Sequence, residues 1–220
     1  MKCRVNNIDV FYEKSGIGQP LILLHGNGEN HGIFDKAIPL LGAHFTVYAL
    51  DSRGHGESEA VSEYHYTDLA EDVKCFIEEL GLERPILYGF SDGGIIGLLL
   101  AAKYPRLLSQ MVISGANTVP EGIRTLWLKL FQGINALVKE PKMDMMLKEP
   151  NITTDMLQSI VIPTTVLAGG RDMVKRSHTE YIVAQIPGSK LRILQGEGHG
   201  SYIVHSTKIA KLILEATMRG

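Results

Sequence analysis

A serine enclosed by glycines lies where a predicted strand meets a predicted helix, and this junction constrains the fold more than any other stretch of the chain. Residues 85–90 (PILYGF) form an apolar, β-prone run, and residues 92–103 (DGGIIGLLLAAK) are typical of a buried helix. Gly89, Ser91 and Gly93, at the junction of the two runs, fit the pattern G-x-S-x-G. A turn this tight strains the serine backbone and leaves no room for side chains beside it, which favours glycine. The pattern predicts that the Ser91 hydroxyl projects at the carboxyl end of a sheet, where α/β proteins bind ligands.

The rest of the chain repeats the alternation of strand and helix. The first residues alternate in hydrophobicity around Asn6-Asn7, as in a β-hairpin. Apolar runs without alternation indicate strands buried on both faces, as in a parallel sheet. These predicted strands are residues 19–26, 44–51, 85–90, 108–116, 162–169 and 189–196, and further helices are expected at 67–81 and 206–218. The chain is therefore expected to have an α/β fold with a mostly parallel, doubly wound sheet.

One segment interrupts this alternation. Residues 118–159 carry apolar residues at helical spacing and then short, methionine-rich pieces. Two interpretations remain open: the segment adds helices that cover the sheet, or it forms a short helical lid over a pocket, with Met143, Met145, Met146 and Met156 as an adaptable lining. The expected division is a core of residues 1–117 and 160–220 with a lid of residues 118–159.

Composition excludes several classes of protein. A chain of 220 residues with 45% hydrophobic and 21% charged residues suits one globular domain. A net charge of −2 and a pI near 6.4 leave no basic field for nucleic acid or an anionic membrane. Cys3 and Cys75 are too few for a disulfide framework or a zinc site. The chain shows neither a signal peptide nor an apolar run of membrane-spanning length, so we expect a cytoplasmic protein without a bound metal.

A serine hydroxyl becomes a useful nucleophile only when a base removes its proton, and His199 is the best candidate for that base. It lies in the glycine-rich sequence GEGHG, after the last predicted strand and before the last helix. His25 also follows a strand, but we expect it to brace its loop. The remaining histidines are expected to be surface or loop residues; they are His31, His44, His55, His65, His178 and His205.

A catalytic histidine needs an acceptor that orients its second ring nitrogen, and Asp172 fills that position in the sequence. It follows the predicted strand at 162–169, so it too is expected at the carboxyl end of the sheet. The chain order Ser91, Asp172, His199 is the order expected for hydrolases that carry G-x-S-x-G on an α/β fold. Three such residues after three different strands predict that Ser91 is a nucleophile.

Acyl transfer also requires hydrogen-bond donors for the oxyanion. One is expected to be the backbone N–H of Asp92, immediately after the nucleophile. The other is expected to be the backbone N–H of Asn27, in the loop HGNGENHG. Gly26 and Gly28 would let this loop approach the substrate closely.

These segments together resemble the α/β-hydrolase superfamily over essentially the whole chain. The signature segments are HGNG, DSRGHGES, GFSDGG, GGRD and GEGHG. The resemblance implies Ser91 as nucleophile, Asp172 as acid, His199 as base and the amides of Asn27 and Asp92 as oxyanion hole. It also implies hydrolysis of an ester, amide, thioester or C–C bond without a cofactor.

A closer similarity is to the valacyclovir hydrolase (biphenyl hydrolase-like) group, whose members cleave α-amino acid esters. The matching stretches are GFSDGGIIGLLLAAKYP and MVISGAN. The resemblance implies that the aspartate after the nucleophile, Asp92, holds the substrate ammonium. Asp92 can instead cap the helix that follows, where a negative charge is favourable. Phe90 stands where that group more usually has tryptophan.

The expected function is hydrolysis of small carboxylic esters, including α-amino acid esters, through an acyl-enzyme on Ser91. Alternatives with the same catalytic set are C–C bond hydrolase, lactonase, perhydrolase and a small-molecule receptor with slow turnover. The expected partner is a small-molecule ester, with neither nucleic acid nor membrane, and a homodimer is compatible with the sequence.

Overall fold

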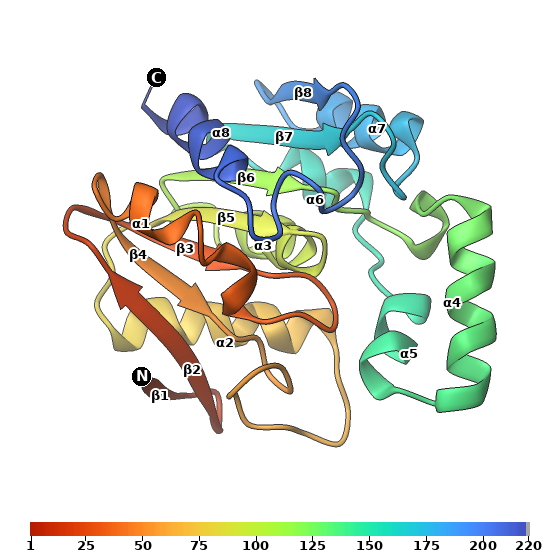
Figure 1. Cartoon of the computed structure of the whole chain (residues 1–220), viewed down its shortest axis with the longest axis horizontal. Coiled ribbons are helices and arrows are strands. Elements are labelled where there is room, and N and C mark those ends of the chain that lie inside the picture. Colours follow the sequence, from red (N-terminus) through yellow and green to blue (C-terminus); the bar gives the residue numbers. More distant parts are fainter. Residues whose placement is uncertain (219–220) are drawn as a thin grey trace.

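The computed structural model describes residues 1–218, and an eight-stranded sheet forms its centre (Figure 1). The strand order is β1-β2-β4-β3-β5-β6-β7-β8. Strand β2 runs antiparallel to both of its neighbours. From β4 through β3, β5, β6 and β7 to β8, each strand is parallel to the next. The strands are β1 (Lys2–Val5), β2 (Ile8–Ser15), β3 (Gln19–Leu24), β4 (Phe45–Leu50), β5 (Ile86–Phe90), β6 (Gln110–Ser114), β7 (Thr164–Gly169) and β8 (Lys190–Leu194). The predicted α/β fold with a mostly parallel sheet is confirmed.

The first two strands form the predicted hairpin. Its two turn residues, Asn6 and Asn7, have φ angles of 43° and 65°. Two successive residues with positive φ are typical of the tight hairpin turn whose twist matches that of the strands, and asparagine tolerates this conformation well.

Helices cover both faces of the sheet because the strand side chains alternate between two apolar clusters. In β3, Ile22 and Leu24 belong to one cluster, which also contains residues of α2 (Tyr66–Glu79) and α3 (Asp92–Lys103). Leu21 and Leu23 point to the other cluster, with α1 (Ile38–Leu41) and α8 (Lys208–Thr217). All four leucines and isoleucines of β3 are fully buried, which explains the continuous apolar run.

The register of the sheet brings the carboxyl ends of the central strands to one edge. Leu24 pairs with Gly89, Phe90 with Ser114, and Gly169 with Leu194. The residues that follow β3, β5, β7 and β8 therefore emerge side by side, although they are far apart in the sequence. The predicted site residues belong to these four segments.

The segment 118–159 divides into two parts. Helix α6 (Thr154–Gln158) packs against α3 with Leu157 fully buried, so it forms part of the layer on the sheet. Helices α4 (Thr125–Val138) and α5 (Pro141–Lys148) stand beyond the carboxyl edge of the sheet, at the right of Figure 1. Met145 of α5 is buried, whereas Met143, Met146 and Met156 are half-buried.

The remaining helix, α7 (Arg176–Gln185), lies between β7 and β8 along the chain. Two short 3₁₀ helices, η1 (His31–Phe34) and η2 (Pro120–Gly122), follow β3 and β6. Among residues 1–218, none of the helices has both the length and the apolar character needed to span a membrane.

Candidate active site

Ser91 occupies the sharp turn between β5 and α3. Its φ and ψ angles are 51° and −111°, a conformation that an ordinary residue rarely adopts. A Cβ atom added at Gly89 would lie 2.1 Å from the carbonyl oxygen of Gly93, and one added at Gly93 would lie 2.4 Å from that of Leu24. The two glycines of the motif are therefore required because backbone atoms pass too close for any side chain.

His199 lies between Ser91 and Asp172 and contacts both. Its Nε2 atom is 3.2 Å from Ser91 Oγ, and its Nδ1 atom is 2.6 Å from Asp172 Oδ1. Ionised carboxylates only accept hydrogen bonds, so Nδ1 carries the proton and Nε2 is left as an acceptor facing the serine. The three residues come from the ends of β5, β7 and β8, and the structure brings them together in the geometry of a nucleophile, a base and its orienting acid.

Asp172 is held in its ionised form although it is only 3% exposed. Burial acts to raise the pKa of its carboxyl group, but the hydrogen bond and charge of His199 outweigh burial, and the pKa lies below its usual value. The backbone N–H groups of Val174 and Gly169 add to this effect, at 3.0 and 3.3 Å. A carboxylate that stays charged can keep the imidazole in the required tautomer.

Two neighbours fix the position of the His199 ring. The ring of Phe90 lies 4.9 Å from it, centroid to centroid. Gly115, directly after β6, has a φ of 62°, and a Cβ atom there would lie only 2.6 Å from Cε1 of His199. Gly115 was not among the residues singled out from the sequence. A glycine inside the predicted strand at 108–116 was the available signal, because it marks a place where another group approaches the backbone.

The two residues expected to form the oxyanion hole are also brought together. The Asn27 side-chain amide donates to Asp92 Oδ2 at 2.9 Å, so the loop after β3 is joined to the start of α3. The Gly93 N–H donates to the carbonyl of His25 at 3.1 Å, and the Gly94 N–H to that of Ser91 at 2.9 Å. These bonds hold the backbones of Asn27 and Asp92 on either side of the serine turn.

The Asp92 carboxylate is enclosed and already accepts two hydrogen bonds. It is 4% exposed, and its Oδ1 accepts from the Tyr66 hydroxyl at 2.7 Å, while Oδ2 accepts from Asn27. Burial raises its carboxyl pKa, and the hydrogen bonds of Tyr66 and Asn27 oppose that rise. Tyr66, the first residue of α2, was missed from the sequence because its hydroxyl reaches Asp92 only after α2 packs beside α3.

A second contact to the loop after β3 comes from α5. The Asn27 side chain donates to the backbone carbonyl of Lys142 at 3.2 Å, and the Lys142 ammonium donates to the carbonyl of Gly54 at 2.9 Å. Glu29 also lies near the serine: a Cβ atom added at Gly26 would be 2.8 Å from its carboxylate and 3.2 Å from Ser91 Cβ. No sequence pattern predicts these contacts, because they depend on where α5 and the loop pack.

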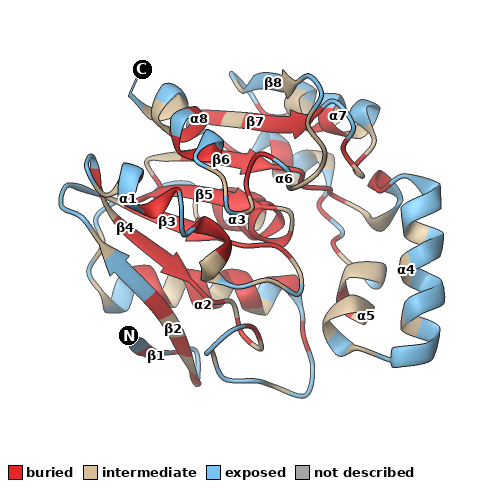
Figure 2. Cartoon of the chain, in the orientation of Figure 1, coloured by how far each residue is buried: buried red, intermediate tan, exposed pale blue. Residues whose placement is uncertain are grey.

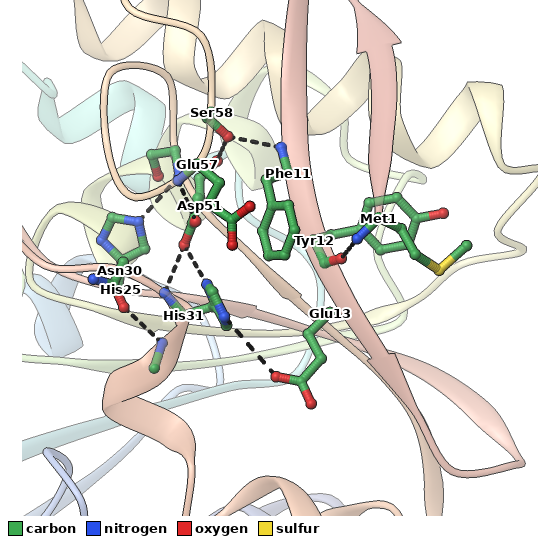
Figure 3. A network of polar contacts seen from close by, with 12 residues as sticks. Met1, Phe11, Tyr12, Glu13, His25, Asn30, His31, Asp51, Glu57 and Ser58 are labelled. Atoms are coloured by element: carbon green, nitrogen blue, oxygen red, sulfur yellow. Dashed lines mark hydrogen bonds and ion pairs between the residues drawn. The ribbon is translucent and has the colours of Figure 1, made fainter.

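A polar network holds the loop after β3 against the loop after β4 (Figure 3). His25 accepts from the Ser52 N–H at 3.0 Å through Nε2, while its Nδ1 lies 2.7 Å from the Gly26 carbonyl. The Asp51 carboxylate accepts from the His31 N–H and ring, each at 2.7 Å, and from the Glu57 N–H at 2.9 Å. As expected, His25 braces the loop. His31 and Asp51 join the loops after β3 and β4 in the same way.

The surface or loop placement expected for the other histidines is wrong for His178, which lies half-buried on α7. His55 lies in a loop but is buried, 4% exposed, with its ring 5.0 Å from that of His25. The segment that contains it folds inward, because Asp51 draws the Glu57 N–H toward the sheet.

Comparison with known proteins agrees with the fold and with the arrangement of Ser91, His199 and Asp172. Residues 19–154 match the model of a family described as alpha/beta hydrolase fold. The chain belongs to this family. The hydrolase is also similar to the mouse and human proteins named Serine hydrolase BPHL, each 29% identical over 96% of this chain and 84% of the relative. The resemblance expected from the motifs around the serine is thus confirmed.

Solved structures resemble the hydrolase over its full length. A bromoperoxidase from Bacillus anthracis superposes with a TM-score of 0.87 at 19% identity, covering 99% of both chains. A structure titled Est816 as an N-acyl homoserine lactone degrading enzyme gives 0.84 at 24% identity, covering 98% of this chain and 99% of that one. At these identities the likeness establishes the fold of the hydrolase and no more.

Proposed function

We propose that the protein hydrolyses small carboxylic esters through an acyl-enzyme on Ser91. The observation that carries this proposal is the placement of the His199 ring, with Nε2 3.2 Å from Ser91 Oγ and Nδ1 2.6 Å from the buried Asp172 carboxylate. Such an arrangement turns a weakly nucleophilic hydroxyl into one that can attack an ester carbonyl.

The reaction proceeds in two halves. Ser91 Oγ attacks the carbonyl carbon while its proton passes to His199 Nε2, and Asp172 stabilises the imidazolium that forms. The oxyanion accepts hydrogen bonds from the N–H groups of Asn27 and Asp92. Collapse expels the alcohol, which takes the proton from His199. Water then attacks the acyl-enzyme, with His199 as base, and releases the acid and free Ser91.

Relatives support an enzyme of this class. The name Serine hydrolase BPHL designates hydrolysis with a serine for relatives that align with 96% of this chain. Similar solved structures include proteins titled as an esterase, an enol-lactonase and a meta-cleavage product hydrolase. The serine, the base and the acid alone do not distinguish these reactions. An ester is the proposed substrate because a serine activated in this way attacks an ester carbonyl, and relatives that cover 96% of this chain are named serine hydrolases.

The first test joins a chemical probe with turnover. A fluorophosphonate should label Ser91, with fluoride as leaving group, and p-nitrophenyl acetate should be hydrolysed over many turnovers. Ser91→Ala should abolish labelling and lower kcat by about 10⁴-fold or more. Labelling of wild type without multiple turnover would replace the esterase proposal by slow-turnover sensing, and absence of both would contradict a reactive serine.

A second test concerns the acyl group. We compare an α-amino acid ester with its des-amino analogue, both with the same alcohol, in wild type and Asp92→Asn. The Asp92 carboxylate already accepts from Tyr66 and Asn27 at 4% exposure, which favours a positioning role. A positioning role predicts that Asp92→Asn lowers kcat/KM by a similar factor for both esters. A loss restricted to the amino ester, seen mainly in KM, would assign ammonium binding to Asp92.

A further inference from the structure

Helix α4 is an amphipathic helix whose apolar face has no covering element in the described structure. None of its fourteen residues is buried, and it is pale blue or tan along its whole length in Figure 2. Six of its large apolar residues are exposed; they are Leu126 (79%), Trp127 (42%), Leu130 (48%), Ile134 (37%), Leu137 (86%) and Val138 (60%). We call these six residues the α4 stripe.

The α4 stripe occupies a single face of the helix. Trp127, Leu130, Ile134 and Leu137 follow the 3-4-3 spacing of a coiled-coil seam, and Leu126 and Val138 lie on its two sides. The contacts with α5 lie on another face: Asn135 accepts from the Glu140 N–H at 2.9 Å and lies 3.5 Å from Asp144. The packing of α4 on α5 therefore leaves the stripe uncovered.

The area of the α4 stripe is at least about half of what one partner contributes to a stable dimer. The six exposures add up to roughly three and a half fully exposed residues, which corresponds to roughly 400–700 Å². The largest apolar patch on a monomer usually covers about 300–600 Å², and a standard interface buries about 800 Å² on each partner.

The pattern of the α4 stripe is symmetric about the level of residue 132. An antiparallel second helix centred there would bring Leu126 opposite Val138, Trp127 opposite Leu137, and Leu130 opposite Ile134 of the other copy. Each apolar residue of the stripe thus meets an apolar residue of the stripe.

From this self-complementarity we infer that the α4 stripe binds the α4 stripe of a second copy of this chain, antiparallel about a two-fold axis at the level of residue 132. Such an isologous contact closes after two subunits. Helix α4 lies at the margin of the molecule in Figure 1, so a second copy can reach it. A membrane is the less suitable occupant, because Lys129 is the one charged residue in a helix of fourteen, and the chain has a net charge of −2.

The test is sedimentation equilibrium of the full chain between 1 and 100 µM, roughly the range in which such an interface associates. Wild type should be a dimer. Leu130→Glu should raise the dimer Kd by about 100-fold or more, because it buries a charge opposite Ile134 of the other copy in an apolar contact. Gln132→Glu is the matched control: it adds the same charge at the same level, but on the face opposite the stripe.

The control should change the dimer Kd less than about twofold, and both variants should keep the circular dichroism of wild type, since neither residue is buried. A monomeric wild type at 100 µM, or equal effects of the two variants, would overturn the proposal. Flotation of a monomeric wild type with phosphatidylglycerol vesicles, lost in Leu130→Glu, would also overturn it and assign the stripe to a lipid surface.

The antiparallel register has its own test. Leu126→Lys should weaken the dimer, and Leu126→Lys with Val138→Glu should restore it, because the register places residue 126 opposite residue 138 of the other copy. A double variant that is weaker than the single one would contradict this register.

Discussion

The backbone of Ser91 has a left-handed φ of 51°, and the two glycines beside it make that conformation sterically possible. At the scale of single residues the candidate site consists of such local requirements: a strained serine, a histidine with one protonated nitrogen, and a buried carboxylate. Each requirement can be removed by a change of a few atoms.

Replacing Asp172 by asparagine should separate charge from shape. The amide keeps the size of the side chain, but it cannot hold a negative charge next to His199 and can reverse the tautomer by donating to Nδ1. We expect kcat for ester hydrolysis to fall by about 10⁴-fold with the thermal unfolding curve nearly preserved. Activity within tenfold of wild type would exclude Asp172 as the orienting acid.

Replacing Gly115 should lower activity through His199, which it contacts. In Gly115→Ala the new methyl group would lie 2.6 Å from His199 Cε1, so the ring must move away from Ser91. We expect kcat to fall by about 10²-fold or more. The matched control is Gly188→Ala, because Gly188 has a similar φ of 71° but no atom within 4 Å of the added Cβ.

Both glycine variants should cost about 1–2 kcal/mol of stability through backbone strain, measurable by urea unfolding. The fall in kcat should occur only in Gly115→Ala. Equal kcat values in the two variants would mean that the ring is not held at this point.

At the scale of elements, loops are tied to helices by buried charge pairs. Arg53, in the loop after β4, donates to the Asp72 carboxylate of α2 through two nitrogens, at 2.6 and 2.5 Å, and the two side chains are 8% and 5% exposed. This contact ties the loop after β4, which carries Asp51, to α2, which begins with Tyr66.

Asp72→Asn should destabilise the fold because it leaves the buried Arg53 charge with only the half-exposed Asp68 carboxylate, 3.6 Å away, as a counter-ion. The expected loss is about 3–5 kcal/mol in the free energy of unfolding measured with urea. Glu78→Gln provides the comparison on the same helix, since it breaks the exposed Lys74–Glu78 pair of 2.7 Å and should cost only about 0.3–0.5 kcal/mol. Similar losses in the two variants would contradict a structural role for the Arg53–Asp72 pair.

At the scale of the whole molecule, buried neutral histidines make stability depend on pH. Burial, reinforced by the nearby His55, lowers the pKa of His25 from 6.5 to about 4. Above pH 6.5 the group is neutral in both states. Between pH 6.5 and 4 the unfolded chain binds the proton and the folded chain does not. The free energy of unfolding therefore decreases as the pH is lowered through this range, by about 3 kcal/mol for His25.

Urea unfolding at pH 7 and pH 4.5 tests this dependence. His25→Gln is expected to be less stable than wild type at pH 7, because its contacts with Ser52 and Gly26 are altered. It should nevertheless lose less stability on acidification, since the buried titrating group is gone. An unchanged difference between the two pH values would attribute the acid sensitivity to other groups.

The sequence by itself determined the strands, the order of the sheet segments in the chain and the positions of Ser91, Asp172 and His199. These features follow from local rules: uninterrupted apolar runs form buried parallel strands, glycines permit the serine turn, and residues that follow parallel strands meet at one edge. Family membership could be inferred from the same segments, because each signature lies within a few consecutive residues.

Only the tertiary structure decided which groups surround those residues. The Tyr66 hydroxyl of α2 donates to Asp92 of α3, and the missing side chain of Gly115 leaves room for the His199 ring. His55 is buried. The helical spacing in residues 118–159 left open whether these helices cover the sheet or form a lid, and the apolar face of α4 is exposed in this structure. Contacts between residues far apart in the chain depend on how helices pack on the sheet, and a periodic pattern predicts that a face is apolar without predicting what covers it.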